Sequence, residues 1–217
     1  MEEQLLPDDI ISEYKSRAEK FRLKILNNIP QVKLKHENMS NCQLILDREM
    51  LLTHMPQAGV VAEIGVNQGD FSRRIFDVCK PQKLHLIDAW HSERYHSGLS
   101  LEVEQKFLKE IDADLIQINR GLSTEVVDEF DDNYFDWVYI DTSHDYRTTK
   151  LELEKYSKKV KEGGIIAGHD YAMGNWLKTY KYGVIEAVHE FCVNSHWELL
   201  FLTLDFTENQ SFAIRKI

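Results

Sequence analysis

The sequence is short of the residues that mark disordered, fibrous or disulfide-stapled chains. Glycine and proline number only 10 and 4 among 217 residues, which excludes a collagen-like, linker-dominated or disordered chain. The three cysteines, Cys42, Cys79 and Cys192, are odd in number, far apart and without a CxxC pair. This pattern disfavours a disulfide framework and a thiolate zinc site. With 43% hydrophobic and 29% charged residues, the composition is that of one globular domain.

Positive charge is also scarce, because 26 lysines and arginines stand against 36 aspartates and glutamates, a net charge of −10. Phosphate binding depends on clustered positive charge, so we expect neither a nucleic acid nor an anionic membrane as the main partner. No apolar run approaches the ~18–20 residues that span a bilayer. The first residues, Met-Glu-Glu-Gln, have the wrong charge for a secretory signal or a transit peptide. We therefore expect a cytoplasmic protein with reduced thiols.

The first part of the chain is predicted to be helical. Apolar residues recur there at 3-4-3-4 spacing, which predicts one amphipathic helix that starts near Pro7 and stops near Pro30. The residues of this stripe are Ile11, Tyr14, Ala18, Phe21 and Ile25. A second helix is predicted from about Ser40 to Pro56. We accordingly divide the chain into an N-terminal helical extension, residues 1–55, and one α/β domain, residues 56–217.

From Gly59 onwards the pattern changes to short apolar runs that alternate with helical segments. Seven runs are predicted strands: 60–64, 83–87, 115–118, 135–140, 165–168, 197–204 and 211–214. The first five alternate with helices, which implies right-handed crossovers and a parallel arrangement. One of these helices is predicted over 146–160, with Gly163 and Gly164 ending it, and another over 184–192. The last two strands have no helix between them and predict an antiparallel pair that closes the sheet.

Ligands of such a sheet bind beyond the carboxyl ends of its strands. Ionisable residues stand at four of the five parallel strand ends: Glu63, Asp88, Asp141 and the pair His169-Asp170. Chance could place one or two of them there, so four indicate a site. Asp88 could hold the hydroxyl pair of a ribose or could cap a turn.

The first strand is followed by a glycine loop of the form E-x-G-x-x-x-G, from Glu63 to Gly69. Gly65 and Gly69 would let the backbone approach a ligand, and the next helix offers its N-terminal amides. Purely structural turns between a strand and a helix also use glycine, and the spacing differs from the dinucleotide fingerprint. Together with Asp88, the loop indicates a nucleoside cofactor.

The chain resembles the class I S-adenosylmethionine-dependent methyltransferases, and within them the metal-dependent group that includes macrolide-sugar O-methyltransferases. Three segments carry the resemblance: VAEIGVNQGDFS, HLIDAW and DWVYIDTSHDYRTTKLELEKYSKKVKEGGIIAGHDY. It covers residues 59–193 and is most specific from Asp141 to Tyr171. It implies a Rossmann-like class I methyltransferase fold, an α/β fold with a mostly parallel seven-stranded sheet, an antiparallel closing strand and added N-terminal helices.

The resemblance also implies which residues bind S-adenosylmethionine. The glycine loop and the acid before it would hold the methionine part, Asp88 the ribose, and the segment from Asn119 to Ser123 would border the adenine. The implied cofactor-binding residues are Glu63, Gly65, Asn67, Gly69, Asp88, Ser123 and Asp141.

A divalent metal, magnesium or manganese, is implied as a second cofactor, with Asp141, His169 and Asp170 as its ligands and His144 as the catalytic base. Relatives often carry an acid where His169 stands. An imidazole there would shift the preference from magnesium towards manganese, iron or another borderline metal, or would fail to bind.

Physical reasoning from the residues agrees with this assignment. Carboxylates at adjacent strand ends repel each other unless a cation joins them. Such a cation would bind a substrate hydroxyl and lower its pKa, and His144 would take the proton. Asp141 as a helix cap and His144 as an ordinary loop histidine stay open as alternatives. Tyr171 and Trp176 could line an acceptor pocket or serve packing.

We therefore predict an enzyme that transfers a methyl group from S-adenosylmethionine, assisted by a divalent metal, to a hydroxyl of a small sugar-like or polyhydroxylated acceptor. We hypothesise that the N-terminal helices cover the acceptor side of the cleft and support a homodimer. The alternatives are a metal-dependent hydroxylase-like relative on the same fold and a non-catalytic nucleotide-binding module.

Overall fold

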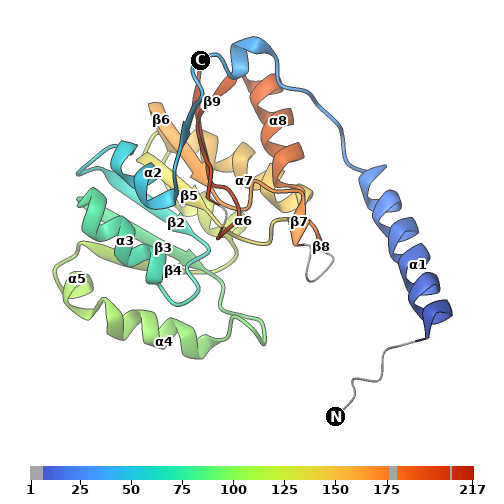
Figure 1. Ribbon diagram of the computed structural model, residues 1–217. Helices are drawn as coiled ribbons and strands as arrows, with labels where there is room; N and C mark the ends of the chain where they lie inside the picture. Colours follow the sequence, from blue (N-terminus) through green and yellow to red (C-terminus); the bar gives the residue numbers. More distant parts are fainter. Residues whose placement is uncertain (1–6, 176–179, 206) are drawn as a thin grey trace.

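A computed structural model describes residues 7–175, 180–205 and 207–217, and its central feature is a twisted eight-stranded sheet (Figure 1). The strand order is β1-β9-β10-β6-β5-β2-β3-β4, and every pairing is parallel except those of β10 with β9 and β6. The strands are β1 (Gln43–Ile45), β2 (Val60–Ile64), β3 (Lys83–Asp88), β4 (Ile116–Arg120), β5 (Phe135–Ile140), β6 (Val160–Gly168), β9 (Trp197–Thr203) and β10 (Phe212–Lys216). All seven predicted strands are therefore present, and the predicted Rossmann-like α/β fold with its antiparallel closing strand is confirmed, although the sheet contains β1 as an eighth strand.

Helices cover both faces of the sheet. On one face lie α2 (Arg48–His54), α3 (Asp70–Cys79) and α4 (Ser97–Lys106), and on the other α6 (Ser123–Val126), α7 (Tyr146–Lys159) and α8 (Val184–Ser195). The remaining elements are α1 (Asp8–Leu26), α5 (Leu108–Asp112), two short 3-10 turns (His36–Asn38 and Val127–Glu129) and a small hairpin of β7 (Gly174–Asn175) with β8 (Tyr180–Lys181).

The central strands are apolar along their whole length because both of their faces are covered. In β5, Trp137 and Tyr139 pack into the core on the α3 side, whereas Val138 and Ile140 pack into the core on the α7 side. This two-sided burial fixes the register of the strand and with it the position of Asp141, the residue that follows Ile140.

The prediction of a second helix over residues 40–56 is wrong in its first half. Residues 43–45 form β1, which pairs in parallel with β9, and helix α2 begins only after Asp47, whose side chain accepts a hydrogen bond from the amide of Met50. The partner of β1 lies more than 150 residues further along the chain, so no local pattern could indicate this strand. Leu51 and Leu52 are fully buried in the core, so this part of the predicted extension belongs to the packed α/β unit.

The helix predicted over 146–160 is present as α7, but the role predicted for Gly163 and Gly164 is wrong. Helix α7 stops at Lys159, and Gly163 and Gly164 lie inside β6 instead of ending the helix. A Cβ atom on Gly164 would stand 2.7 Å from the carbonyl oxygen of Asp136, so glycine is needed there for the close approach of β6 to β5.

Helix α1 has the predicted bounds but extends away from the rest of the molecule (Figure 1). None of its residues is buried, in contrast to those of α2. Within the described ranges, no helix combines the length and the apolar character needed to cross a membrane.

Candidate functional site

A cavity of about 830 Å³ opens at the carboxyl ends of β2, β5 and β6. Its floor is formed by the loop after β2, by residues 141–144 after β5 and by His169 and Asp170 after β6. Arg94 and Tyr95, in the loop after β3, and residues of the β7–β8 hairpin complete its wall. The cavity therefore lies where a doubly wound sheet is expected to bind ligands.

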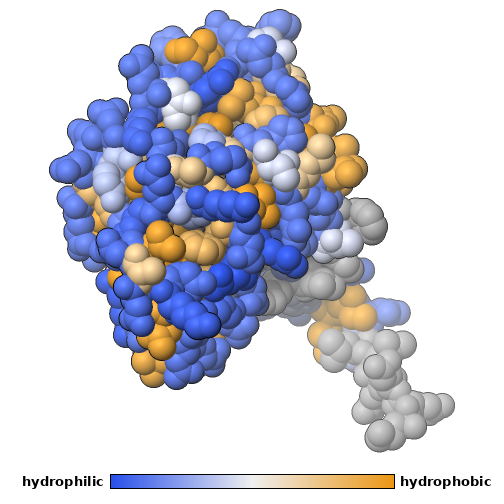
Figure 2. Space-filling model, turned by 90° about the vertical axis from the view of Figure 1, so that its left-hand side faces the viewer, coloured by the Kyte–Doolittle hydropathy of each residue, from blue (hydrophilic) through white to orange (hydrophobic). Residues whose placement is uncertain are grey.

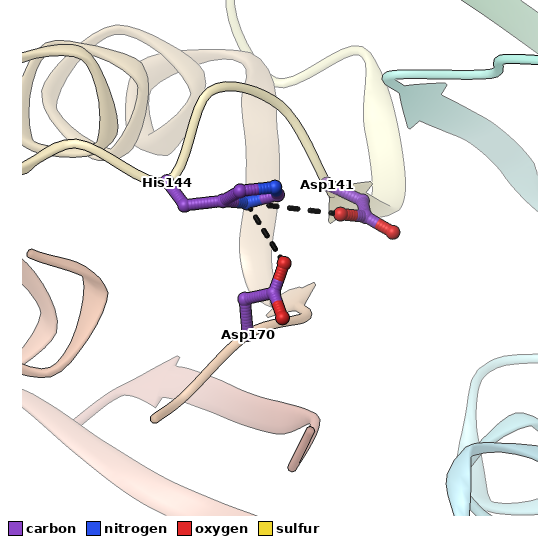
Figure 3. A group of neighbouring side chains, drawn as sticks. All are labelled: Asp141, His144 and Asp170. Atoms are coloured by element: carbon purple, nitrogen blue, oxygen red, sulfur yellow. Dashed lines mark ion pairs between the residues drawn. The ribbon is translucent and has the colours of Figure 1, made fainter. Parts of the chain in front are cut away.

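Two acids and a histidine meet at this cavity (Figure 3). The Nδ1 atom of His144 is 2.9 Å from Oδ2 of Asp170 and 3.9 Å from Oδ1 of Asp141. His144 and Asp170 both have left-handed backbone conformations, with φ values of 60° and 56°. Such conformations are uncommon outside glycine and are often held at functional sites by the surrounding structure.

The charges of this cluster are coupled. Burial raises the pKa of Asp141. Burial opposes the charged form of His144, but the hydrogen bond and the charge of Asp170 outweigh it, so the pKa of His144 is raised. Burial would raise the pKa of Asp170 in the same way, but the hydrogen bond and charge of His144 hold it below its usual range. The hydrogen bond between His144 and Asp170 thus couples the protonation of the two groups.

The chemistry of this donor set fits a divalent cation. One ligand atom from each of Asp141, His144 and Asp170 lies within 4.8 Å of the others. Carboxylate oxygens suit magnesium and manganese, and an imidazole nitrogen is compatible with manganese and other borderline metals. The structure therefore brings together three of the four residues that the sequence assigned to metal binding and base catalysis.

His169, the remaining predicted ligand, lines the same cavity but is not part of this close group of donors. Its Nδ1 atom is 2.9 Å from the hydroxyl of Ser211, and its Nε2 atom is 3.8 Å from a carboxylate oxygen of Glu208. Its Nδ1 atom is thus engaged by Ser211, and its Nε2 atom faces Glu208.

The two glycines of the glycine loop have different surroundings. Gly65 and Asn67 line the cavity, and Gly65 has a φ of 94° and lies so near β5 that a Cβ atom would stand 1.9 Å from the carbonyl oxygen of Asp141. Gly69 caps α3 and does not line the cavity, and a Cβ atom there would meet the ring of Phe107 at 2.9 Å. Its conformation, with a φ of 73°, serves the turn into the helix.

Glu63 lines the cavity from the end of β2 and is only 2% exposed. Burial raises its pKa to about 8, although a hydrogen bond from the Ser72 hydroxyl acts in the opposite direction. Burial of Glu63 thus favours its protonated form.

Neither Asp88 nor Ser123 lines the cavity. The carboxylate of Asp88 accepts hydrogen bonds from the backbone amides of Val66, Asn67 and Trp90, at 2.9, 3.0 and 2.9 Å. The hydroxyl of Ser123 donates to Glu152. Both residues are therefore held by protein groups in this arrangement.

Sequence reasoning missed several residues of the site. Arg48, at the start of α2, forms an ion pair with Glu208 at 2.8 Å, and its guanidinium lies 4.6 Å from the ring centre of Phe71. Asn209 donates a hydrogen bond to Asp170, and the ring of Tyr182 packs against that of His144 at 4.9 Å. These residues come from segments on either side of the strands that carry the motifs, and no local pattern distinguishes them.

The two aromatic residues considered for the acceptor pocket have different outcomes. The Tyr171 hydroxyl interacts with Nε2 of His189 at 2.5 Å, and its ring packs near that of Phe212. Tyr171 does not line the cavity and serves packing. Trp176 lies outside the described residues.

The comparisons with known proteins agree with this geometry. Residues 62–171 match a family model described as a methyltransferase domain. No curated protein matches the sequence significantly.

Several solved structures share the fold. The pyocyanin biosynthetic protein PhzM superposes with a TM-score of 0.57 at 8% identity, over 74% of this chain and 51% of that one. A putative O-methyltransferase from Nostoc punctiforme gives 0.56 at 15% identity, over 77% and 55%. A putative methyltransferase from Streptococcus mutans, solved in complex with SAH, gives 0.56 at 12% identity, over 78% and 96%. The chain thus spans about half the length of two of these relatives, and at such identities the likeness shows the fold.

Proposed function

This chain belongs to the methyltransferase domain family as a class I S-adenosylmethionine-dependent enzyme, and we propose that it methylates a hydroxyl group of a small, polyhydroxylated or sugar-like acceptor with the help of a divalent cation. The observation that carries the proposal is the cluster of Asp141, His144 and Asp170 at the cavity floor. Methylation of a hydroxyl needs a group that removes its proton, and this cluster offers one.

His144 is the proposed base. Its Nδ1 atom faces Asp170 at 2.9 Å, so Asp170 can fix the orientation of the ring and stabilise the imidazolium that forms. The other ring nitrogen is then the atom that accepts the proton of the acceptor hydroxyl. As the bond between oxygen and the methyl carbon forms, the carbon–sulfur bond of the sulfonium breaks, and its electron pair stays on the sulfur of S-adenosylhomocysteine.

Asp141 and Asp170 are the proposed metal ligands, with magnesium or manganese as the ion. The bound cation would lower the pKa of the acceptor hydroxyl and orient its oxygen. His169 stays a candidate third ligand because it lines the same cavity, although its ring contacts Ser211 and Glu208.

The proposed contacts of S-adenosylmethionine lie along β2 and its loop. Glu63, Gly65 and Asn67 border the cavity next to the cluster, as expected for residues that hold the methionine part. Asp88 is proposed for the ribose, since a carboxylate accepts about four hydrogen bonds and three backbone amides use this one. Ser123 stays the proposed neighbour of the adenine.

The lining of the cavity supports a polar acceptor. Arg94, Asn175, Tyr180, Glu208 and Asn209 all offer hydrogen-bonding groups there. A volume of about 830 Å³ falls in the range of ~300–1,000 Å³ that small-molecule sites occupy. We therefore propose that the cavity takes the reacting end of the cofactor together with one small acceptor.

Helix α1 is proposed to border the acceptor side, because its last turn and the β7–β8 hairpin line one groove through Leu26 and Tyr180, and Tyr180 also lines the cavity. Since β1 and α2 belong to the core, the N-terminal extension proper is α1 and its linker. A protein that lacks residues 1–30 should fold and bind S-adenosylhomocysteine but turn over its acceptor poorly. Full turnover would exclude this role.

The decisive test uses S-adenosylmethionine with an isotope-labelled methyl group and a panel of sugars, polyols and amines, with and without EDTA. We expect label in a hydroxylated product, loss of activity on chelation and recovery with manganese or magnesium. Label in amines alone would overturn the assignment to oxygen. A hydroxylated but unmethylated product would instead favour the hydroxylase-like alternative.

A further inference from the structure

Helix α7 carries an acid on the face that it packs against the rest of the domain. The buried residues of this helix are Thr149, Glu152, Leu153 and Tyr156, and Glu152 is 0% exposed. Charged side chains usually lie at the surface, and Figure 2 shows hydrophilic side chains over most of the face that it draws. A glutamate is almost never fully buried without polar partners. The partners of Glu152 therefore indicate what it does in the core.

The carboxylate of Glu152 accepts hydrogen bonds from two different loops. Its Oε1 atom is 2.5 Å from the hydroxyl of Ser123, which begins α6 after β4. Its Oε2 atom is 2.9 Å from the hydroxyl of Thr142, in the loop after β5. Side chains of a helix lean towards its N-terminus, which is how Glu152 reaches a residue that precedes α7. Both oxygens have a partner, so one side chain joins the loop after β4 to the loop after β5.

Thr142 connects Glu152 to the candidate site. It stands between Asp141 and His144 in the chain, and all three residues line the cavity. At the end of this loop, the carbonyl of His144 accepts a hydrogen bond from the amide of Gly183 at 2.8 Å. The loop is thus held at Thr142 by a side chain of α7 and at His144 by the backbone that leads into α8.

The start of α6 gives Glu152 a fixed support. The hydroxyl of Tyr156, one turn further along α7, donates to the backbone carbonyl of Ser123 at 3.1 Å. The ammonium of Lys155 donates to the carbonyl of Thr124 at 2.7 Å. Helix α7 therefore contacts this segment through three side chains, and Glu152 is the one of the three that also bonds to the loop after β5.

Burial makes an acid costly at this position. It raises the pKa of Glu152 to about 7, although the hydrogen bonds from Ser123 and Thr142 act in the opposite direction. An apolar side chain of similar size would avoid this cost. A buried polar network in which every member is satisfied instead fixes one arrangement of the groups that it joins. The acid therefore indicates a role in the geometry of the two loops.

We propose that Glu152 is a positioning residue, which holds the loop after β5 against the start of α6 so that Asp141 and His144 keep the arrangement needed for metal binding and proton removal. This role rests on the functions proposed above for Asp141 and His144. Glu152 does not line the cavity and acts through Thr142. A displacement of about 1 Å can reduce a rate ~10²-fold, so the loss of one hydrogen bond that holds the loop should be measurable.

The first test separates positioning from stability. Glu152→Leu keeps a similar volume and removes both hydrogen bonds, and Thr142→Val removes only the one to the loop. Both variants should lose ~10-fold or more in kcat and bind manganese more weakly, measured by electron paramagnetic resonance, with little change in melting temperature. Glu152→Gln and Thr142→Ser, which keep hydrogen-bonding groups, should restore most of the loss. The matched control is Glu154→Gln, on the same helix with a side chain 50% exposed.

A double variant shows whether Thr142 acts through Glu152. In the Glu152→Leu protein, Thr142→Val should have little further effect on kcat, because the hydrogen bond is already absent. A full additional loss would assign Thr142 a contact of its own with the substrate and overturn the proposal. So would kcat and manganese affinity that equal those of the wild type in both single variants.

The second test needs neither metal nor substrate. Amide hydrogen exchange over residues 141–145 of the ligand-free chain should be faster in Glu152→Leu and Thr142→Val than in the wild type, and unchanged in Glu154→Gln. Unchanged exchange in both loop variants would overturn the positioning role even if the enzyme methylates its acceptor. Faster exchange in a protein that methylates no acceptor would count against the proposed function and still support the hold of Glu152 on the loop.

Discussion

The acids at the ends of β3 and β5 occupy equivalent places in the sheet but have different surroundings. Asp88 accepts three backbone hydrogen bonds and does not line the cavity, so it holds the glycine loop in this structure and keeps about one acceptor position for the proposed ribose contact. Asp141 lines the cavity and lies 3.9 Å from Nδ1 of His144, which also contacts Asp170. An acid at the end of a strand thus has a structural role where it accepts hydrogen bonds from backbone amides, as Asp88 does. It is a candidate metal ligand where a second acid lies close by, as at Asp141.

The difference follows from the course of the chain after each strand. After β3, Trp90 has a φ of 42° and its amide points back at Asp88, while its indole donates to the carbonyl of Asn67. After β5, the chain runs through Thr142 and Ser143 along the cavity to His144. The turn after β3 therefore places backbone amides around Asp88, whereas the turn after β5 leaves Asp141 facing the cavity.

The largest effect should follow from removal of the acids at the cavity. Asp141→Asn and Asp170→Asn should each lose bound manganese, measured by elemental analysis, and with it nearly all turnover, because the amide removes the charge that holds the ion. Affinity for S-adenosylhomocysteine, measured by calorimetry, should change only modestly. If metal-free wild type is fully active, the metal has no part in the reaction.

His144→Ala should retain the metal-binding acids and lose ~10²–10⁴-fold in turnover, the usual contribution of a general base. A surface histidine on α2, tested as His54→Ala, is the matched control and should leave turnover unchanged. Loss of bound metal in His144→Ala would instead identify His144 as a ligand, since its Nδ1 atom belongs to the same donor group.

Asp88→Asn should affect stability more than the reaction. Three backbone amides would lose an anionic acceptor, which predicts a loss of about 1–3 kcal/mol in unfolding free energy, measured by urea denaturation. Affinity for S-adenosylhomocysteine should fall as well, because the amides of Val66 and Asn67 hold the loop. A variant of unchanged stability that loses only cofactor affinity would make Asp88 a ligand and abolish the contrast with Asp141.

A further effect, which depends on pH, concerns Glu63, whose pKa is raised to about 8 mainly by burial. A carboxyl that keeps its proton in the folded state gives stability that is fully present below its unfolded pKa of ~4.3 and is lost as the pH rises through its folded pKa. Glu63→Gln removes this dependence, so its melting temperature should rise relative to the wild type between pH 5 and pH 9. The control Glu102→Gln, at an exposed position on α4, should show a constant difference.

Strong local patterns made much of the fold predictable. The central strands were identifiable because burial on both faces requires uninterrupted apolar runs, and α1 because its stripe is confined to one face. Strand β1 could not be predicted, because it forms only by pairing with β9. The start of β6 could not be predicted either, because Gly163 and Gly164 are compatible with a strand as well as with the end of a helix.

For the site, the sequence alone determined which residue types stand at the strand ends, since the order of strand, loop and helix places Glu63, Asp141 and Asp170 at one edge of a parallel sheet. Tertiary structure decided their surroundings: it closed the backbone around Asp88, set His144 against Asp170 and turned His169 towards Ser211. It also brought Arg48 and Glu208 to the cavity from segments 160 residues apart. The partners of a side chain depend on how distant segments pack and on which hydrogen-bond donors lie close to each acid. The spacing of residues along the chain determines neither of these.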